Sequence, residues 1–216
     1  MTDSAKHLDL SLYLITDARI IGSRSLEALV EGALRGGATV LQYREKNKST
    51  RAMVKEAMTL AALCRRYGVT FIINDRIDVA LAVDADGVHL GQDDMPLPLA
   101  RRLLGADRII GVTVHNPEEI REAQEHGADY LSLAPVFATT TKPDHQKPLG
   151  IDGLKKLMTW VECPAVAIGG INAQNIRDVL LTGVDGVCVV SAVLAQDDPE
   201  LAARTLRSLM PTKPAS

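Results

Sequence analysis

Short apolar segments alternate with longer amphipathic segments along the chain, and this alternation restricts the fold more than any other feature of the sequence. Short apolar runs bounded by turn residues are typical of buried parallel strands, and the longer segments are typical of helices that cover them. The predicted strands cover residues 12–16, 39–44, 70–74, 87–90, 108–114, 130–136, 165–168 and 186–190. The predicted helices cover residues 25–35, 50–67, 76–83, 96–104, 117–126, 152–160, 174–182 and 199–209. Eight such units predict a closed parallel (β/α)8 barrel, with an open doubly wound sheet as the alternative.

The sequence shows no sign of a domain boundary. Its 216 residues contain no linker and no shift in composition, so we expect a single domain over residues 1–216, with the barrel over residues 10–210 and frayed ends. About 250 residues are usual for this kind of barrel, so the chain would be a compact example. The longest irregular segment, residues 138–150, is polar and contains prolines, which predicts either a mobile lid or a surface insertion.

Composition and charge argue against two classes of partner. A net charge of −3 and an aromatic content of 3% do not fit nucleic-acid binding, which uses basic surfaces and stacked rings. The N-terminus lacks the apolar core of a signal peptide, and no apolar run approaches the roughly 18 residues that span a bilayer. Cys64, Cys163 and Cys188 stand singly in apolar stretches, which predicts inert buried thiols. We therefore expect a cytoplasmic protein without nucleic-acid or membrane partners; the sequence leaves a homo-oligomer open.

The most informative stretch is the pentad that runs from Gln42 to Lys46, directly after an apolar run. Side chains of a strand alternate between its two faces, so Gln42, Arg44 and Lys46 share one face at the strand's carboxyl end. Cations at the edge of an apolar core need a partner. A bound anion is one such partner, and the carboxylates of Glu45 or of neighbouring strands are another.

Polar residues also follow the other predicted strands, and functional residues of such barrels lie at the carboxyl ends of the strands. The groups are Asn74, Asp75 and Arg76; His89, Gln92, Asp93 and Asp94; Thr113 and His115; Thr139 to Lys142; Gly169 and Gly170; and Ser191. Barrels often bind phosphate through the last two of these loops. Gly169-Gly170 allows close approach of backbone N–H groups and Val190-Ser191 offers more at a helix start, although Gly-Gly also suits a plain tight turn.

Two carboxylates in these groups are candidate metal ligands. Asp75 and Asp94 suit Mg²⁺, which takes few protein oxygens and shares phosphate oxygens with a substrate. Their structural alternatives are an ion pair with a nearby arginine and a helix N-cap, respectively. His89, His115 and His145 have no adjacent serine or cysteine nucleophile, so we expect structural roles for them.

Seven segments, in chain order, resemble the motifs of the thiamine-phosphate synthase family. They are QYREK (42–46), IINDR (72–76), DGVHLGQDD (86–94), GVTVH (111–115), PVFATTTK (135–142), IGGI (168–171) and VVSAV (189–193). Each segment alone is weak evidence, but their common order across residues 12–193 is specific. The resemblance implies a TIM barrel and a transferase of alkyl or aryl groups.

The family joins 4-amino-5-hydroxymethyl-2-methylpyrimidine diphosphate to 4-methyl-5-(2-hydroxyethyl)thiazole phosphate. The products are thiamine monophosphate and pyrophosphate, with CO₂ when the thiazole carries a carboxylate. Mg²⁺ is the implied cofactor, with Asp75 and Asp94 as its ligands because the family's G-Q-x-D spacing selects Asp94 over Asp93. The implied pyrimidine diphosphate contacts are Gln42, Tyr43, Arg44, Glu45, Lys46, Asn74, Thr113 and Lys142, and the implied thiazole phosphate contacts are Thr139, Thr140, Thr141, Gly170, Val190 and Ser191.

The implied mechanism is dissociative. Arg44, Lys46 and Lys142 are the catalytic cations that help to draw off pyrophosphate, and the thiazole nitrogen then attacks the pyrimidine cation. Two residues depart from the family's usual pattern: Thr113 stands where serine is usual and keeps the hydroxyl, and Ala138 stands where proline is common and would loosen the following loop.

Two alternative functions remain at this point. One is an isomerase of the same barrel type, a thiazole tautomerase, which lacks the intact Asn-Asp and Gly-Gln-x-Asp motifs that are present here at Asn74, Asp75 and Asp94. The other is a noncatalytic barrel that binds a thiazole or thiamine phosphate and needs no metal ligands.

Overall fold

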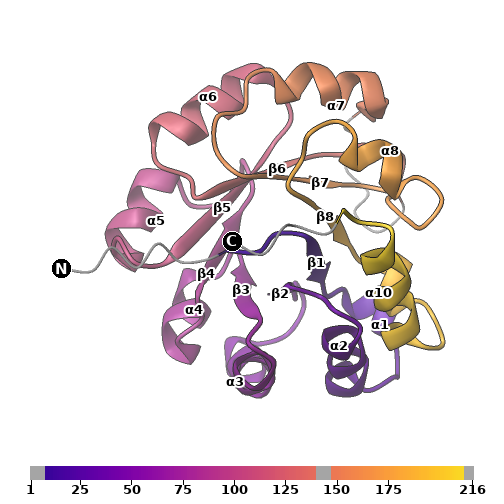
Figure 1. Cartoon of the computed structure of the whole chain (residues 1–216). Helices are drawn as coiled ribbons and strands as arrows, with labels where there is room; N and C mark the ends of the chain where they lie inside the picture. Colours follow the sequence, from indigo (N-terminus) through magenta and orange to yellow (C-terminus); the bar gives the residue numbers. More distant parts are fainter. Residues whose placement is uncertain (1–7, 140–146, 212–216) are drawn as a thin grey trace.

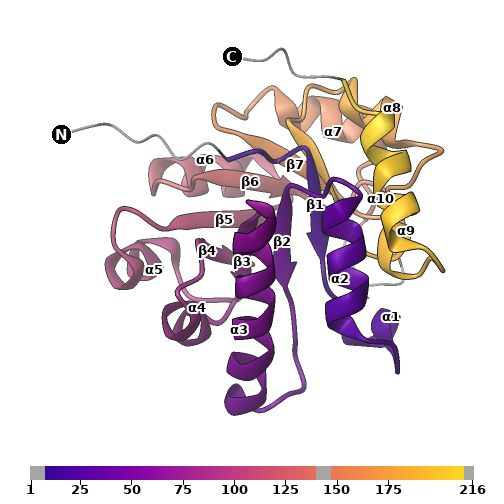
Figure 2. The same cartoon turned by 60° about the horizontal axis from the view of Figure 1, so that its bottom comes forward.

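Eight parallel strands close into a barrel in the order β1 to β8, and the helices surround it (Figure 1). The computed structural model describes residues 8–139 and 147–211. The prediction of a closed barrel is confirmed, and the open sheet is excluded because β1 pairs with both β2 and β8. Figure 2 shows α2 and α3 lying along the outside of the first strands.

The strands are short and the helices vary in length. The strands are β1 Leu12–Ile15, β2 Val40–Tyr43, β3 Thr70–Asn74, β4 Gly87–Leu90, β5 Ile109–Val114, β6 Tyr130–Leu133, β7 Ala165–Ile168 and β8 Gly186–Val189. The helices are α1 Ala18–Ile21, α2 Leu26–Arg35, α3 Thr50–Tyr67, α4 Ile77–Val83, α5 Leu97–Leu104, α6 Pro117–Glu125, α7 Gly150–Met158, α8 Ile176–Leu180, α9 Ser191–Leu194 and α10 Pro199–Ser208.

Side-chain caps mark where several helices begin. Ser25, Ser49 and Asn116 each accept a hydrogen bond from a backbone N–H in the first turn of the helix that follows. Such a cap satisfies one of the N–H groups that a helix start leaves unpaired. The sequence-based strands and helices match the structure closely, but α1 and α9 were not predicted, since each is a single turn and carries too short a pattern to recognise.

The alternation of side chains separates two apolar layers. Outward-facing residues such as Leu12 and Leu14 pack with the helices in one cluster, whereas Tyr13, Tyr130 and Val166 belong to a separate cluster inside the barrel. Gly111 makes room for the second tyrosine, because a Cβ at this position would lie 2.0 Å from the Tyr130 ring. A methyl group at Gly111 would therefore force the tyrosine ring or the strand to shift.

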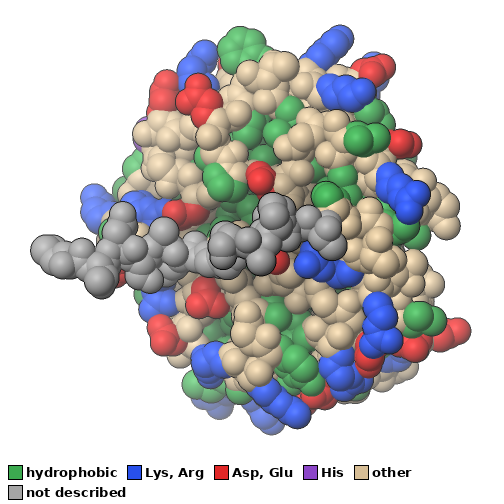
Figure 3. Space-filling model, viewed as in Figure 1, with side chains coloured by type: hydrophobic (Ala, Val, Ile, Leu, Met, Phe, Trp, Pro, Cys, Tyr) green, Lys and Arg blue, Asp and Glu red, His purple; other side chains and the backbone are tan. Residues whose placement is uncertain are grey.

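The described surface carries charges of both signs. In the view of Figure 3, basic and acidic side chains are interspersed around the molecule rather than gathered by sign. None of the helices in the described part of the chain is both long and apolar enough to cross a lipid bilayer.

The thiols should resist modification in the folded protein. Burial raises the pKa of Cys64 to about 12 and that of Cys163 to about 11, so at pH 8 only about one Cys163 in a thousand is a thiolate, against about a quarter in an unfolded chain. We expect iodoacetamide at pH 8 to label both residues slowly in the native protein and readily in urea, as measured by mass spectrometry. Fast labelling of the native protein at either residue would contradict this expectation.

Candidate active site

A cavity of about 690 Å³ opens at the carboxyl ends of the strands. Its floor is built from inward-facing residues of neighbouring strands, among them Gln42 of β2, Asn74 of β3, His89 of β4 and Thr113 of β5. On each of these strands the residue two positions earlier also faces inward. These earlier residues are Val40, Ile72, Gly87 and Gly111, so the barrel interior changes from apolar to polar toward this end. A cavity with a few polar groups gathered at its floor is typical of small-molecule sites.

Arg44 is fixed at one side of the cavity by the strand next to it. Its Nη1 lies 2.9 Å from Oδ2 of Asp17, whose side chain is only 3% exposed, and its backbone N–H donates to Oγ1 of Thr16 at 2.9 Å. Asp17 and Thr16 both line the cavity and follow β1. The guanidinium is therefore held in place before any ligand arrives, which lowers the entropy cost of binding an anion.

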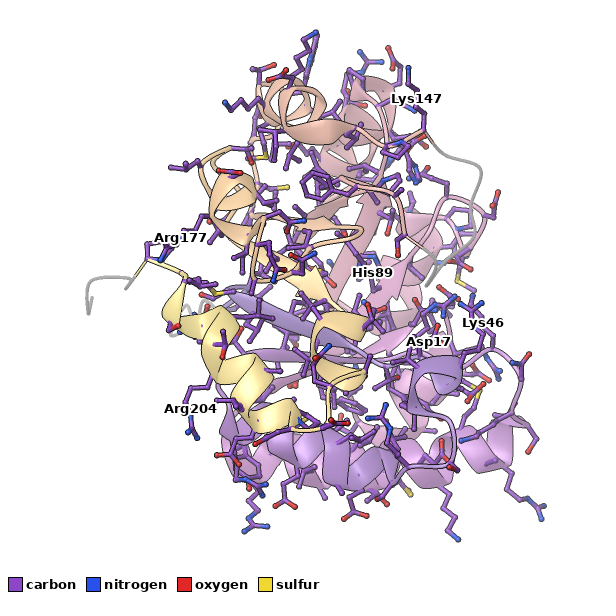
Figure 4. The ribbon with its side chains drawn as sticks, turned by 90° about the vertical axis from the view of Figure 1, so that its right-hand side faces the viewer. Asp17, Lys46, His89, Lys147, Arg177 and Arg204 are labelled. Atoms are coloured by element: carbon purple, nitrogen blue, oxygen red, sulfur yellow. The ribbon has the colours of Figure 1, made fainter. Side chains whose placement is uncertain are left out.

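Lys46 forms an ion pair with Asp75, which follows β3. Asp75 has a φ of 59°, an uncommon backbone conformation that aspartate tolerates better than most residues. Its backbone N–H donates to the carbonyl oxygen of His89 at 2.9 Å. Hydrogen bonding to the next strand thus holds a strained residue at the cavity, as is frequent at functional sites. Figure 4 shows Lys46, Asp17 and His89 toward one end of the barrel, away from Arg177 and Arg204.

Asp94 lies beside Asp75 and completes an acidic pair. Its Oδ2 accepts a hydrogen bond from the backbone N–H of Gly91 at 2.7 Å. Burial, together with hydrogen bonding and repulsion from Asp75, raises the pKa of Asp94 to about 6, against a smaller opposing effect of Lys46. Two carboxylates held this close bind a proton or a cation favourably, because either relieves their repulsion.

The carboxylates of Asp75 and Asp94 suit Mg²⁺ better than a metal ion that takes all of its ligands from the protein. Among residues 8–139 and 147–211, no group of three or more His, Cys, Asp or Glu side chains is placed to hold a metal ion. Mg²⁺ keeps several waters and takes its remaining ligands from one or two carboxylates and from substrate phosphates. Asp75 and Asp94 supply that number of carboxylates, and both line the cavity.

The opposite side of the cavity is built from backbone. Gly169 and Gly170, after β7, have φ values of 111° and 64°, and a Cβ on Gly170 would lie 2.8 Å from the carbonyl oxygen of Ala138. Only glycine therefore fits where the loops after β6 and β7 pack together. Val190 and Ser191 line the cavity at the start of α9. Backbone N–H groups at a helix start and a glycine turn are suitable donors for phosphate oxygens.

Some of the predicted contacts lie elsewhere. Thr139 lines the cavity, whereas Thr140, Thr141, Lys142 and most of the predicted lid lie outside the described residues. Tyr43 and Glu45 are described but face away from the cavity, as the alternation of the strand requires. Tyr43 donates from its hydroxyl to Glu56 of α3 at 2.7 Å, and Glu45 accepts from the backbone N–H of Asn47 at 2.7 Å.

Asp17 is not among the predicted site residues, although Thr16-Asp17 stands at the exit of the first predicted strand. His89 was assigned a structural role, but it is a polar residue at an inward position of a short strand and lies on the cavity floor. A polar residue at a strand exit or at an inward strand position is the sequence signal that marks both.

Comparison with known proteins agrees with this geometry. The family model described as thiamine monophosphate synthase matches residues 12–193. The chain belongs to this family. A thiamine-phosphate synthase from Chloroflexus aurantiacus is 57% identical over 203 residues, covering 94% of each chain. One from Clostridium novyi is 50% identical over 202 residues, covering 94% of this chain and 99% of its own.

A solved structure has the same architecture. The thiamine phosphate pyrophosphorylase from Pyrococcus furiosus has a TM-score of 0.86 and is 46% identical, and the match covers 94% of this chain and 96% of that one. The predictions of family, fold and transferase activity are therefore confirmed. Neither the tautomerase nor the noncatalytic alternative is favoured.

Replacement of Asp94 tests the acidic pair. Burial and the neighbouring Asp75 raise the pKa of Asp94, so the ionised Asp94 side chain is unfavourable at pH 7.5, and Asp94→Asn should raise the stability by about 1 kcal/mol after solvent screening. Mg²⁺ is expected to raise the melting temperature of the unmodified protein, and the same change should abolish that rise. Asp93→Asn is the matched control, because Asp93 is exposed and does not line the cavity. A Mg²⁺-dependent rise that survives in Asp94→Asn would contradict the assignment.

Proposed function

We propose that the cavity binds a pyrimidine diphosphate and a thiazole phosphate side by side and joins them into thiamine monophosphate. The observation that carries this proposal is that two different groups of candidate anion-binding residues line one cavity. Arg44, Lys46 and the acidic pair form one site, and the glycine turn with the start of α9 forms the other. A volume of about 690 Å³ falls within the range of small-molecule sites.

The charged side is suited to the diphosphate. Arg44 and Lys46 project into the cavity from the end of β2, and each is already paired with a carboxylate of a neighbouring strand. We assign Asp75 and Asp94 as the residues that hold Mg²⁺. When bound, Mg²⁺ neutralises charge on the diphosphate oxygens. Lys142 is the third proposed cation, by family resemblance.

The polar floor is suited to the pyrimidine ring. Gln42, Asn74 and Thr113 present amide and hydroxyl groups at the base of the cavity, next to the charged side. Thr139, Gly170, Val190 and Ser191 are the proposed contacts of the thiazole phosphate, with Thr140 and Thr141 added by family resemblance. Tyr43 and Glu45 stay predicted substrate contacts by family resemblance; the Tyr43 hydroxyl donates to Glu56 of α3, and Glu45 accepts from the backbone N–H of Asn47.

The proposed reaction breaks the bond between the pyrimidine methylene carbon and the diphosphate oxygen. The electron pair leaves with pyrophosphate, where Arg44 and Lys46 stabilise the growing negative charge. The thiazole nitrogen then donates its lone pair to the methylene carbon, and a C–N bond forms. Cys188 lines the cavity, but burial raises the pKa of its thiol, which disfavours covalent catalysis. Positioning and charge are therefore the main contributions of the protein.

We propose one domain over residues 1–216, with the barrel over residues 10–210, because all eight strands close one sheet. A cytoplasmic location and a homo-oligomeric state stay predictions.

Release of pyrophosphate tests the proposed reaction. The purified protein, given both substrates and Mg²⁺, should release pyrophosphate and form thiamine monophosphate, and EDTA should lower the rate about 100-fold or more. Asp75→Ala should cause a loss of similar size, whereas Asp93→Ala should not. Turnover that is insensitive to EDTA would remove the metal assignment, and absence of product with both substrates would overturn the proposed function.

A methyl group at Gly170 tests the second phosphate site. Gly170→Ala should raise the KM for the thiazole phosphate about 10-fold or more and change the KM for the pyrimidine diphosphate less, because the Cβ would displace the loop after β6. Gly183→Ala is the matched control: its φ is also positive, at 97°, but a Cβ there meets nothing within 4 Å. Equal effects on both KM values would mean that the two phosphate sites are wrongly assigned.

A further inference from the structure

The pentad has two residues that face away from the cavity, and both contact a small network that ends on α3. Tyr43 is 2% exposed, and the side chain of Glu45 is 4% exposed. The Tyr43 hydroxyl donates to Oε2 of Glu56 at 2.7 Å. Nζ of Lys48 lies 2.5 Å from Oε1 of Glu56 and 3.7 Å from Oε2 of Glu45. We call these four side chains the outer brace, since they fasten the segment after β2 to α3, which lies along the outside of the barrel (Figure 2).

Lys46 depends on its backbone for its direction. Its side chain is 51% exposed and pairs with Asp75, so packing around this long, flexible stem contributes little to its position. The backbone on either side of Lys46 is held by Glu45, whose Oε1 accepts from the N–H of Asn47 at 2.7 Å. This hydrogen bond closes a short loop of chain with Lys46 as its middle residue. The orientation of the Glu45 carboxylate therefore affects where the Lys46 ammonium group lies.

Lys48 supplies the positive charge that the outer brace needs. It pairs with two carboxylates, and one of them, Glu45, is almost fully buried. An ionised carboxylate in such a place is costly without a cation beside it. Burial and the neighbouring Glu56 raise the pKa of Tyr43, so its hydroxyl keeps the proton that it donates. Without Lys48, we expect Glu45 to turn toward water and to release the N–H of Asn47.

We propose that Lys48 and Glu56 are positioning residues for the diphosphate site, because the outer brace keeps Lys46 directed at the acidic pair. Neither residue lines the cavity, so both act through Lys46 and not by touching the substrate. In this arrangement the inward residues of the pentad face the cavity, while the outward ones fasten the segment that carries them. This inference rests on the proposed function, which assigns the diphosphate to Arg44 and Lys46.

Removal of the Lys48 charge tests the inference. In steady-state kinetics with both substrates and Mg²⁺, Lys48→Gln should raise the KM for the pyrimidine diphosphate about 10-fold and change the KM for the thiazole phosphate little, because a misdirected Lys46 weakens the diphosphate site alone. Lys48→Arg keeps a cation in the outer brace and should bring the KM back to within about threefold of the unmodified value. Calorimetric titration with pyrophosphate and Mg²⁺ should show that Lys48→Gln lowers the affinity about 10-fold.

Glu56→Gln and Glu31→Gln form a matched pair of variants. Glu31 of α2 also accepts from a tyrosine hydroxyl, that of Tyr67 at 2.9 Å, and also pairs with a cation, Arg66, at 3.3 Å. Tyr67 ends α3 shortly before β3 begins, so this second network lies at the amino end of the barrel, away from the cavity. Both variants should lower the melting temperature to a similar small extent, because their ion pairs are partly exposed. Only Glu56→Gln should raise the KM for the pyrimidine diphosphate.

The outcomes separate a positioning role from a structural one. The inference would be overturned by an unchanged pyrophosphate affinity in Lys48→Gln, by an equal rise of both KM values, or by a Lys48→Arg variant as impaired as Lys48→Gln. Equal kinetic effects of Glu56→Gln and Glu31→Gln would overturn it as well, since the outer brace would then contribute only stability. Absence of product from the unmodified protein would instead overturn the proposed function, and the pyrophosphate titration would still decide the inference. Absence of both product and pyrophosphate binding would overturn both.

Discussion

Closure of eight parallel strands is the constraint on which the other features of this protein depend. Closure brings all the carboxyl ends of the strands to one end of the barrel, and the alternation of side chains then decides which residues meet there. Below that end the interior is filled by apolar residues and two tyrosines. At the end itself, the inward positions carry polar side chains, and the cavity forms above them. A single geometric rule therefore separates the packed core from the site.

The charges at the site are balanced between strands rather than within one. Arg44 is paired with Asp17 across β1 and β2, and Lys46 with Asp75 across β2 and β3. Partly buried cations without such partners would be costly, so the pairs orient the two cations and make their presence at the cavity tolerable. Asp94 adds negative charge beside Asp75, and burial together with that neighbouring carboxylate raises the pKa of Asp94. The proposed magnesium ligands therefore lie where carboxylates outnumber cations.

The two sides of the cavity differ in how they are held. The charged side and the floor are built largely on strand residues or on residues directly after them, whereas the backbone side depends on the packing of the loops after β6 and β7 and on the short helix α9. Strand positions vary little when ligands bind, whereas loops adapt more readily. This division suits a site that must hold one reactant firmly and admit a second beside it.

The sequence by itself determined the order of strands and helices, the barrel and the family, because these depend on local periodicity and on motifs that stand at the strand exits. Alternation within the pentad also separated Gln42, Arg44 and Lys46 from Tyr43 and Glu45, although family resemblance placed all five at the substrate. Only the tertiary structure decided which side chains meet. Arg44 and Asp17 are 27 positions apart, and Tyr13 and Tyr130 are 117 apart. Pairing across strands depends on register and on which neighbours share an inward position, and no local pattern encodes a contact over such a separation.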